Sequence, residues 1–104
     1  YLGPDMSHHK SALAPNFTHS QDSALLHLTF AHWDQPFTVI HDCVLGRSCD
    51  MTDMNREIRW HFAEMYKEPV LQNWADEVGV SIPTGLIKNT LDIDLVHDSQ
   101  YFFC

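Results

Sequence analysis

Residues 36–46 read Pro-Phe-Thr-Val-Ile-His-Asp-Cys-Val-Leu-Gly, an apolar, β-branched stretch with an acid at its centre. The Thr-Val-Ile part favours a strand, and Val44-Leu45 can begin a second one. We therefore predict two short strands, over residues 37–41 and 43–47, that pair like a hairpin. His41-Asp42 then falls at or near the junction between them.

The carboxylate of Asp42 needs a physical explanation, because a charge within an apolar run costs free energy unless something compensates it. A bound Mg²⁺ would do so, since hard cations take oxygen ligands and leave room for substrate phosphates. The simpler alternative is a turn acid between two hairpin strands. The stretch by itself favours that alternative, so the choice depends on the rest of the chain.

Upstream of the hairpin the sequence predicts one helix. Apolar residues recur at helical spacing over residues 16–32, and Asp34-Gln35-Pro36 ends the pattern. Residues 1–15 contain the breakers Gly3-Pro4 and Ala14-Pro15, so we predict that they are irregular.

Downstream the sequence predicts two more helices. An apolar stripe over residues 51–66 indicates a helix that Asp50 would cap. A shorter helix starts at Glu68-Pro69 and ends at Gly79. The expected fold class is therefore α+β: a β-hairpin packed by about three helices, with residues 16–79 as a helix–hairpin–helix–helix core. Residues 80–104 would form a C-terminal extension.

Composition limits the classes of function. The chain has 104 residues and a formal net charge of −8, with only six Lys and Arg residues. A free-standing nucleic-acid-binding module is usually basic, so the charge argues against one. It does not argue against a part of a larger nucleic-acid enzyme, where a metal site tolerates acidity.

Cysteine usage and hydropathy indicate where the protein works. The three cysteines, Cys43, Cys49 and Cys104, are widely spaced and form no Cys-x-x-Cys zinc signature. A reducing, intracellular setting is the simplest interpretation. The sequence contains no signal-peptide pattern and no apolar run long enough to span a membrane, so no membrane partner is expected.

Three motifs occur in order along the chain. They are Pro15-Asn16-Phe17-Thr18-His19-Ser20-Gln21-Asp22, then His41-Asp42-Cys43, then the aromatic end Ser99-Gln100-Tyr101-Phe102-Phe103-Cys104. This set resembles the carboxy-terminal palm of the single-subunit RNA polymerases of bacteriophages and mitochondria, whose motif C is His-Asp-Ser or His-Asp-Cys. The resemblance covers nearly the whole chain from about Asp5. It implies that residues 1–104 are the C-terminal part of the palm of a longer polypeptide.

The resemblance implies roles for three residues. Asp42 would be catalytic and would bind Mg²⁺ in a two-metal site whose second carboxylate lies outside residues 1–104. His41 would be a second catalytic-site residue, near the RNA 3′ end, and His19 would bind the minor-groove side of the template–RNA hybrid. The structural alternatives are a packed, hydrogen-bonded His41 and a His19 that only supports its helix.

Two further expectations follow from the same resemblance. Cys43 would be a small packed residue, and roles beyond it do not transfer, because Val44-Leu45-Gly46-Arg47 departs from the family pattern. At the chain end, Tyr101, Phe102 and Phe103 would dock on the rest of the polymerase, with Phe103 as the best anchor. Before them, the alternation of apolar residues over 91–95 suggests a strand, whereas the resemblance suggests a helical turn capped by Asp94.

The expected function is that of a DNA-directed RNA polymerase, which transfers nucleotides from NTPs to an RNA 3′-OH. Its partners would be a DNA template, the RNA product, NTPs and the remainder of the polymerase chain, and residues 1–104 alone would be inactive. Three alternatives stay open: a family A-type DNA polymerase palm, an HD-type phosphohydrolase and a non-enzymatic acidic interaction module. The Pro15-to-Asp22 motif argues against the first. The location would be a host bacterial cytoplasm for a phage enzyme, or a mitochondrion.

Overall fold

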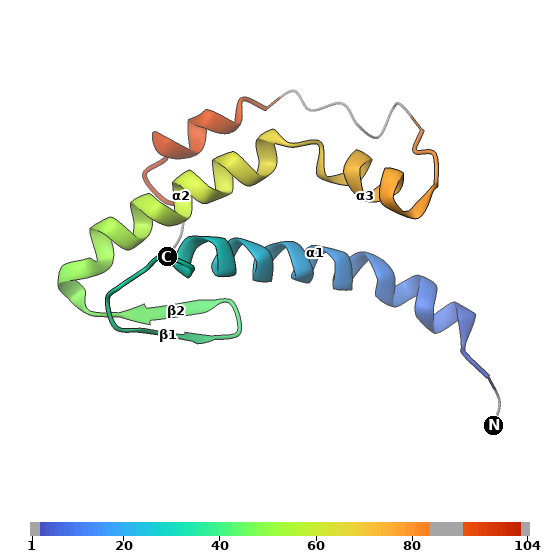
Figure 1. Cartoon of the computed structure of the whole chain (residues 1–104), viewed down its shortest axis with the longest axis horizontal. Coiled ribbons are helices and arrows are strands. Elements are labelled where there is room, and N and C mark those ends of the chain that lie inside the picture. Colours follow the sequence, from blue (N-terminus) through green and yellow to red (C-terminus); the bar gives the residue numbers. More distant parts are fainter. Residues whose placement is uncertain (1–2, 84–90, 103–104) are drawn as a thin grey trace. The chain divides into compact units, whose positions relative to one another are not determined.

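The computed structural model describes residues 3–83 and 91–102. In these ranges the chain forms three α-helices, one two-stranded antiparallel sheet and short 3₁₀ helices, which confirms the predicted α+β class (Figure 1). The chain divides into two compact units, residues 1–50 and 51–104, so the predicted core over residues 16–79 spans both. The elements are α1 (Met6–Phe30), β1 (Phe37–Ile40), β2 (Cys43–Gly46), η1 (Ser48–Asp50), α2 (Met51–Lys67), α3 (Val70–Val78) and η3 (Ile93–His97).

The first helix is longer than the sequence predicts. α1 already begins at Met6, so the expectation of irregular structure over residues 1–15 is wrong from that residue onward. Asp5 explains the early start, because its Oδ1 accepts hydrogen bonds from the backbone amides of Ser7 (3.0 Å) and His8 (3.1 Å). These bonds satisfy two of the amides that every helix start leaves without a partner.

Pro15 lies inside α1 without ending it. A proline within a helix costs about 3 kcal/mol, chiefly because one backbone hydrogen bond is lost and the ring crowds the preceding turn. The neighbours Ala12, Leu13 and Ala14 are strong helix formers, which favours continuation through this position. A breaker in the sequence therefore marks a local cost here and not a boundary.

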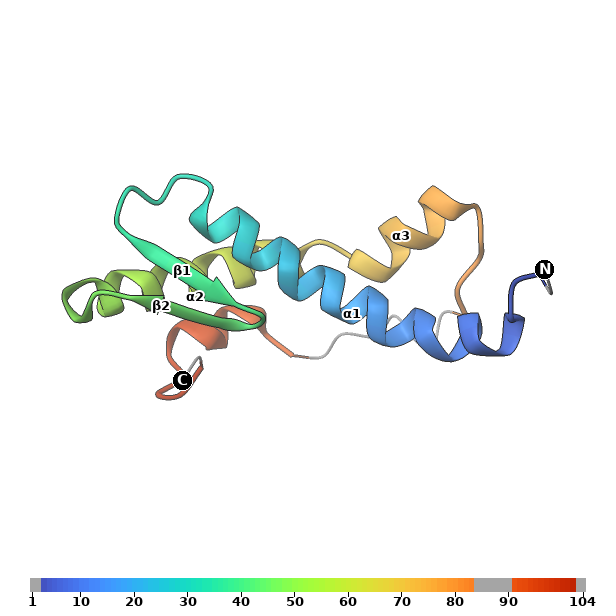
Figure 2. The same cartoon turned by 90° about the horizontal axis from the view of Figure 1, so that it is seen from below.

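The hairpin forms where the sequence predicts it. β1 and β2 pair antiparallel with Ile40 opposite Cys43, which leaves His41 and Asp42 as a two-residue turn. Each strand is one residue shorter than predicted, because the residues beyond Ile40 and Gly46 turn away from the pairing. Within the first unit the hairpin lies beside the C-terminal half of α1 (Figure 2), where the rings of Phe30 and Phe37 stack with centroids 4.5 Å apart.

Arg47 fixes the open end of the hairpin. Its Nε donates to Oδ2 of Asp50 (2.8 Å), and its Nη2 donates to the Gln35 side chain just before β1. The hydrogen bond to Asp50 also raises the pKa of Arg47 above its ordinary value. The two chain segments that enter and leave the hairpin are thus joined by one guanidinium.

In the second unit, α2 supplies most of the core. Its stripe buries Met54 and Ile58 almost completely, as the sequence pattern predicts, and Ala63, five residues further on, is buried too. α3 starts after Pro69 and ends at Gly79, whose φ of 75° is the left-handed conformation that suits glycine at a helix end. The limits predicted for both helices are confirmed to within two residues.

The C-terminal segment folds as a helical turn and not as a strand. The 3₁₀ helix η3 lies alongside α2 (Figure 1), and Lys67 Nζ bonds the Asp94 carboxylate at 3.2 Å. The predicted cap residue is wrong, however, because Asp92 caps the turn by accepting from the Asp94 amide (3.1 Å). A cap residue stands before the helix that it caps, and Asp94 is already inside this one. No helix in the described parts of the chain is both long and apolar enough to cross a membrane.

Candidate functional site

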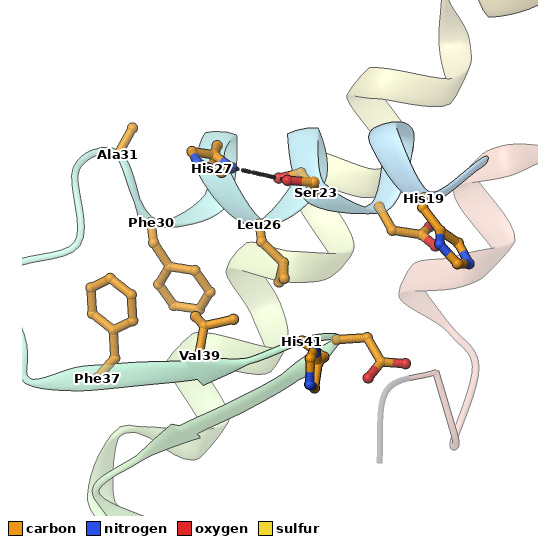
Figure 3. Close-up of a pocket in the computed structure, with 11 residues that line it drawn as sticks. His19, Ser23, Leu26, His27, Phe30, Ala31, Phe37, Val39 and His41 are labelled. Atoms are coloured by element: carbon orange, nitrogen blue, oxygen red, sulfur yellow. Dashed lines mark hydrogen bonds between the residues drawn. The ribbon is translucent and has the colours of Figure 1, made fainter. Parts of the chain in front are cut away.

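The first unit contains a pocket between the C-terminal half of α1 and the hairpin (Figure 3). Its volume is about 920 Å³. The residues that line it are His19, Asp22, Ser23, Leu26, His27, Phe30, Ala31, Phe37, Val39, His41 and Asp42. Three of them, His19, His41 and Asp42, were predicted as site residues from two separate motifs, and the fold places them on one pocket.

The pocket has an apolar part and a polar part. In Figure 3 the side chains of Leu26, Phe30, Phe37 and Val39 face one another between helix and hairpin. His19 on α1 and His41 at the tip of the hairpin lie toward the other end. Apolar walls with a few convergent polar groups are the usual composition of a ligand site.

Asp42 occupies the second position of the hairpin turn and is exposed. No hydrogen bond or ion pair of its carboxylate occurs within the described ranges. Its oxygens are therefore available to a ligand, and a hard cation is the ligand that carboxylates suit best. The same described residues contain no cluster of three or more His, Cys, Asp or Glu arranged for a metal ion. Asp42 thus fits one part of a metal site, and further ligands would have to come from elsewhere.

His41 holds an uncommon backbone conformation. Its φ is 57°, and it is the one non-glycine residue with positive φ among those described. This region costs about 1–2 kcal/mol for L-residues, although histidine adopts it more often than most. The strand pair Ile40–Cys43 on either side closes the turn and forces the conformation. The turn therefore carries strain next to Asp42, which is where functional sites often store it.

His19 projects from α1 and is exposed. Three more pocket residues lie around it: Asp22, which ends the motif that contains His19 but was given no role of its own, and Ser23 and His27, which no motif marks. Their spacing from His19 of three, four and eight residues places them on the same helix face, and that periodicity could have found them. His27 has a structural partner of its own, because its Nδ1 donates to the Ser23 carbonyl at 2.8 Å (Figure 3).

Cys43 differs from the expectation, whereas the predicted docking of the aromatic end on the rest of the polymerase stays a prediction. The Cys43 thiol is exposed within the described structure, whereas a packed residue was predicted. Tyr101 is 87% exposed, while Phe102 packs against Phe62 of α2 with ring centroids 4.8 Å apart. The predicted anchor, Phe103, lies outside the described residues. Within the described residues, Phe102 is thus packed against α2 of this same chain.

Comparison with known proteins identifies relatives along almost the whole chain. A family described as DNA-dependent RNA polymerase matches residues 3–88. The DNA-directed RNA polymerase of Pseudomonas phage phiKMV is 36% identical, with 96% of this chain and 13% of the phage protein aligned. The mitochondrial DNA-directed RNA polymerase 1 of Arabidopsis thaliana is 31% identical, over 89% of this chain and 10% of that protein.

The human mitochondrial DNA-directed RNA polymerase is 29% identical, over 96% of this chain and 10% of that protein. The chain therefore spans only about a tenth of the length of these three relatives. No solved structure matches it.

Proposed function

The chain belongs to the family of DNA-dependent RNA polymerases, and on this premise we propose that it forms part of the catalytic palm of a single-subunit enzyme that transcribes DNA. The observation that carries the proposal is the pocket on which His19, His41 and Asp42 meet. Family membership also favours this function over a phosphohydrolase or an acidic interaction module. The relatives come from a phage and from organelles, so the proposed location is a host bacterial cytoplasm or a mitochondrion.

The proposed reaction is nucleotidyl transfer. The 3′-hydroxyl of the RNA attacks the α-phosphate of an NTP, the bond to the β-phosphate breaks, and pyrophosphate leaves. The hydroxyl has to lose its proton as the new bond forms, and negative charge develops on the attacking and leaving oxygens. A carboxylate at the end of a short rigid turn is suited to such a site, because its position does not depend on a flexible loop.

Asp42 would hold the Mg²⁺ ion that this reaction class requires. When bound, the ion would stabilise the charge that develops on the reacting oxygens. Two features of the chain support this assignment: the Asp42 carboxylate is exposed, and it has no competing partner among the described residues. The two-residue turn between paired strands keeps the carboxylate at the tip of the hairpin.

His41 and His19 would position the RNA. The His41 backbone is fixed by the closed turn, so its imidazole can meet the RNA 3′ end at a defined place beside Asp42. His19 lines the same pocket from α1 and would contact the sugar edge of the hybrid, where the 2′-hydroxyl distinguishes RNA from DNA. Imidazole nitrogens can both donate to and accept from a hydroxyl, as this task requires.

The test is primer extension by the complete polymerase that contains this segment. We expect extension of an RNA primer on a DNA template with NTPs, no extension without template, and none by purified residues 1–104 alone. Preference for dNTPs would identify a DNA polymerase instead. Synthesis by residues 1–104 would contradict the view that they hold only part of the site.

A further inference from the structure

We propose that Arg59 is a positioning residue that holds the C-terminal segment on α2 and, through that segment, supports nucleotidyl transfer. The link to catalysis rests on the proposed function, together with the expectation that the aromatic end docks on the rest of the polymerase, whereas the anchor itself can be tested without activity. Arg59 is 9% exposed, and it is the one charged side chain that is buried among the described residues. Every contact of Arg59 described below lies within the second unit, residues 51–104.

The guanidinium of Arg59 joins α2 to the C-terminal segment. On its own helix, Nε donates to Oδ1 of Asn55 at 2.6 Å. Toward the segment, Nη1 donates to the backbone carbonyl of Val96 in η3. The guanidinium carbon also lies 5.3 Å from the ring centroid of Phe102, in the range of a cation–π contact.

No carboxylate pairs with Arg59 within the described ranges. Its charge is compensated instead by two neutral oxygens and the face of an aromatic ring, which a planar guanidinium can engage together. A lysine ammonium offers a point charge and cannot copy this arrangement. The contacts therefore depend on arginine at this position and not simply on a positive charge.

The second tether of the segment is much more exposed. Lys67 and Asp94 form an ion pair at 3.2 Å, but their side chains are 47% and 61% exposed. Pairs of this kind contribute little, because water and salt screen them. The dominant anchor is thus Arg59, together with the contact of Phe102 against Phe62.

The anchor fixes the part of the chain that precedes the exposed Tyr101. Ser99 Oγ donates to the Tyr101 carbonyl at 3.1 Å and closes a small turn there. With Phe102 docked on one side and this turn on the other, the 87% exposed Tyr101 is presented outward from a fixed backbone. Loss of Arg59 would release the segment while leaving the sequence of the aromatic end unchanged.

The experiment compares Arg59→Met with Arg56→Met in the complete polymerase. Arg56 is the matched control, because it lies one turn earlier on α2 with its side chain 71% exposed and, among the described residues, pairs only with Asp53. We expect Arg59→Met to lower kcat for elongation by about tenfold, with little change in the KM for NTPs, because the variant loses the charged hydrogen bond to the Val96 carbonyl that ties the segment to α2. Arg56→Met should keep the wild-type kcat, and Arg59→Lys should recover only part of the loss.

Combination with a deletion separates positioning from simple folding. If Arg59 acts through the segment, then Arg59→Met should add no further loss to a polymerase lacking Tyr101–Cys104. Losses that multiply, or a wild-type kcat in Arg59→Met, would overturn the proposal.

Should Arg59→Met fail to fold, Phe102→Leu weakens the same anchor from the segment side and should lower kcat in the same direction. Unchanged kcat in Phe102→Leu would then overturn the proposal. Hydrogen exchange tests the anchor independently of activity: amides of η3 should exchange about tenfold faster in Arg59→Met, while those of α3 stay unchanged. Unchanged exchange in η3 would reject the anchor, whereas an inactive wild-type polymerase would reject only the proposed function.

Discussion

The hairpin turn and the C-terminal segment both contain residues that a family motif singles out, yet their surroundings are opposite. At the turn, Asp42 is exposed and without a partner among the described residues, beside a strained His41. In the segment, Phe102 is held by Phe62 and by the buried Arg59. The difference separates two tasks. A side chain that must bind a ligand keeps its polar atoms free, whereas a side chain that must hold a segment in place has its contacts made within the chain.

The largest expected effect concerns the hairpin turn, where the Asp42 carboxylate is exposed. In the complete polymerase, Asp42→Asn should lower the rate of elongation by about three orders of magnitude, because a neutral amide cannot balance the metal's charge. The measurement is single-turnover primer extension. Asp34→Asn is the control, since Asp34 is exposed in the same unit but does not line the pocket. Elongation near the wild-type rate in Asp42→Asn would refute the role of this carboxylate.

The next largest effect concerns the C-terminal segment, which Phe62 and Arg59 hold on α2. Deletion of Tyr101–Cys104 should lower elongation by about tenfold without global unfolding, because it removes Phe102 from its contacts on α2 while the buried stripe of Met54 and Ile58 remains. Elongation assays and thermal melting of the same preparation measure the two quantities. Full activity in the deletion would mean that the aromatic end is only packing.

A smaller effect is expected from His19→Ala. This variant tests whether His19 binds the RNA or only supports its helix. In this variant the preference for NTPs over dNTPs should fall by about three- to tenfold, as expected for the loss of about one hydrogen bond, and the melting temperature should not change. Competition between NTPs and dNTPs gives the preference. His32→Ala serves as control, since His32 is exposed in the same unit and does not line the pocket. An unchanged preference with a large loss of melting temperature would favour a structural role.

The smallest effect concerns Lys67. Its hydrogen bonds to Glu64 and then to Asp94 raise its pKa above the ordinary value of 10.5. A raised pKa means that the stabilising contribution is complete below pH 10.5 and disappears as the pH rises through the higher folded value. Lys67→Met should therefore lower the melting temperature by less than about 2 °C near neutral pH. At a pH where Lys67 of the wild type is deprotonated, the variant and the wild type should melt at the same temperature. A large change at neutral pH would make this exposed pair a main tether.

Local chemistry decided which parts of the fold could be predicted. The hairpin and its junction follow from β-branched residues on both sides of His41-Asp42, and α2 follows from its apolar stripe. The start of α1 was missed because Pro15 looks like a boundary, and only the Asp5 hydrogen bonds show that the helix has a stable beginning before it. The Asp5 cap favours an early start of the helix and Pro15 opposes it. Which of the two effects is larger depends on contacts that the sequence alone does not show.

The site divides in the same way. His19, His41 and Asp42 could be named because motifs mark them, although nothing in their spacing shows that they share a pocket. Arg59 carries no motif, and a charged residue on a helix is normally expected to face solvent. Its burial depends on a partner far along the chain, the Val96 carbonyl. Long-range contacts of this kind are the part that sequence patterns cannot supply.

The two-residue turn has a consequence for insertions and deletions. One added residue must either enlarge the loop or shift the pairing of Ile40 with Cys43. Because side chains alternate along a strand, a shift by one residue would redirect every side chain on one strand to the opposite face. In either case Asp42 would still be present, but no longer at the second position of a two-residue turn. Natural variants and engineered grafts of this segment should thus accept changes of residue type along the strands far more readily than any change in the length of the loop.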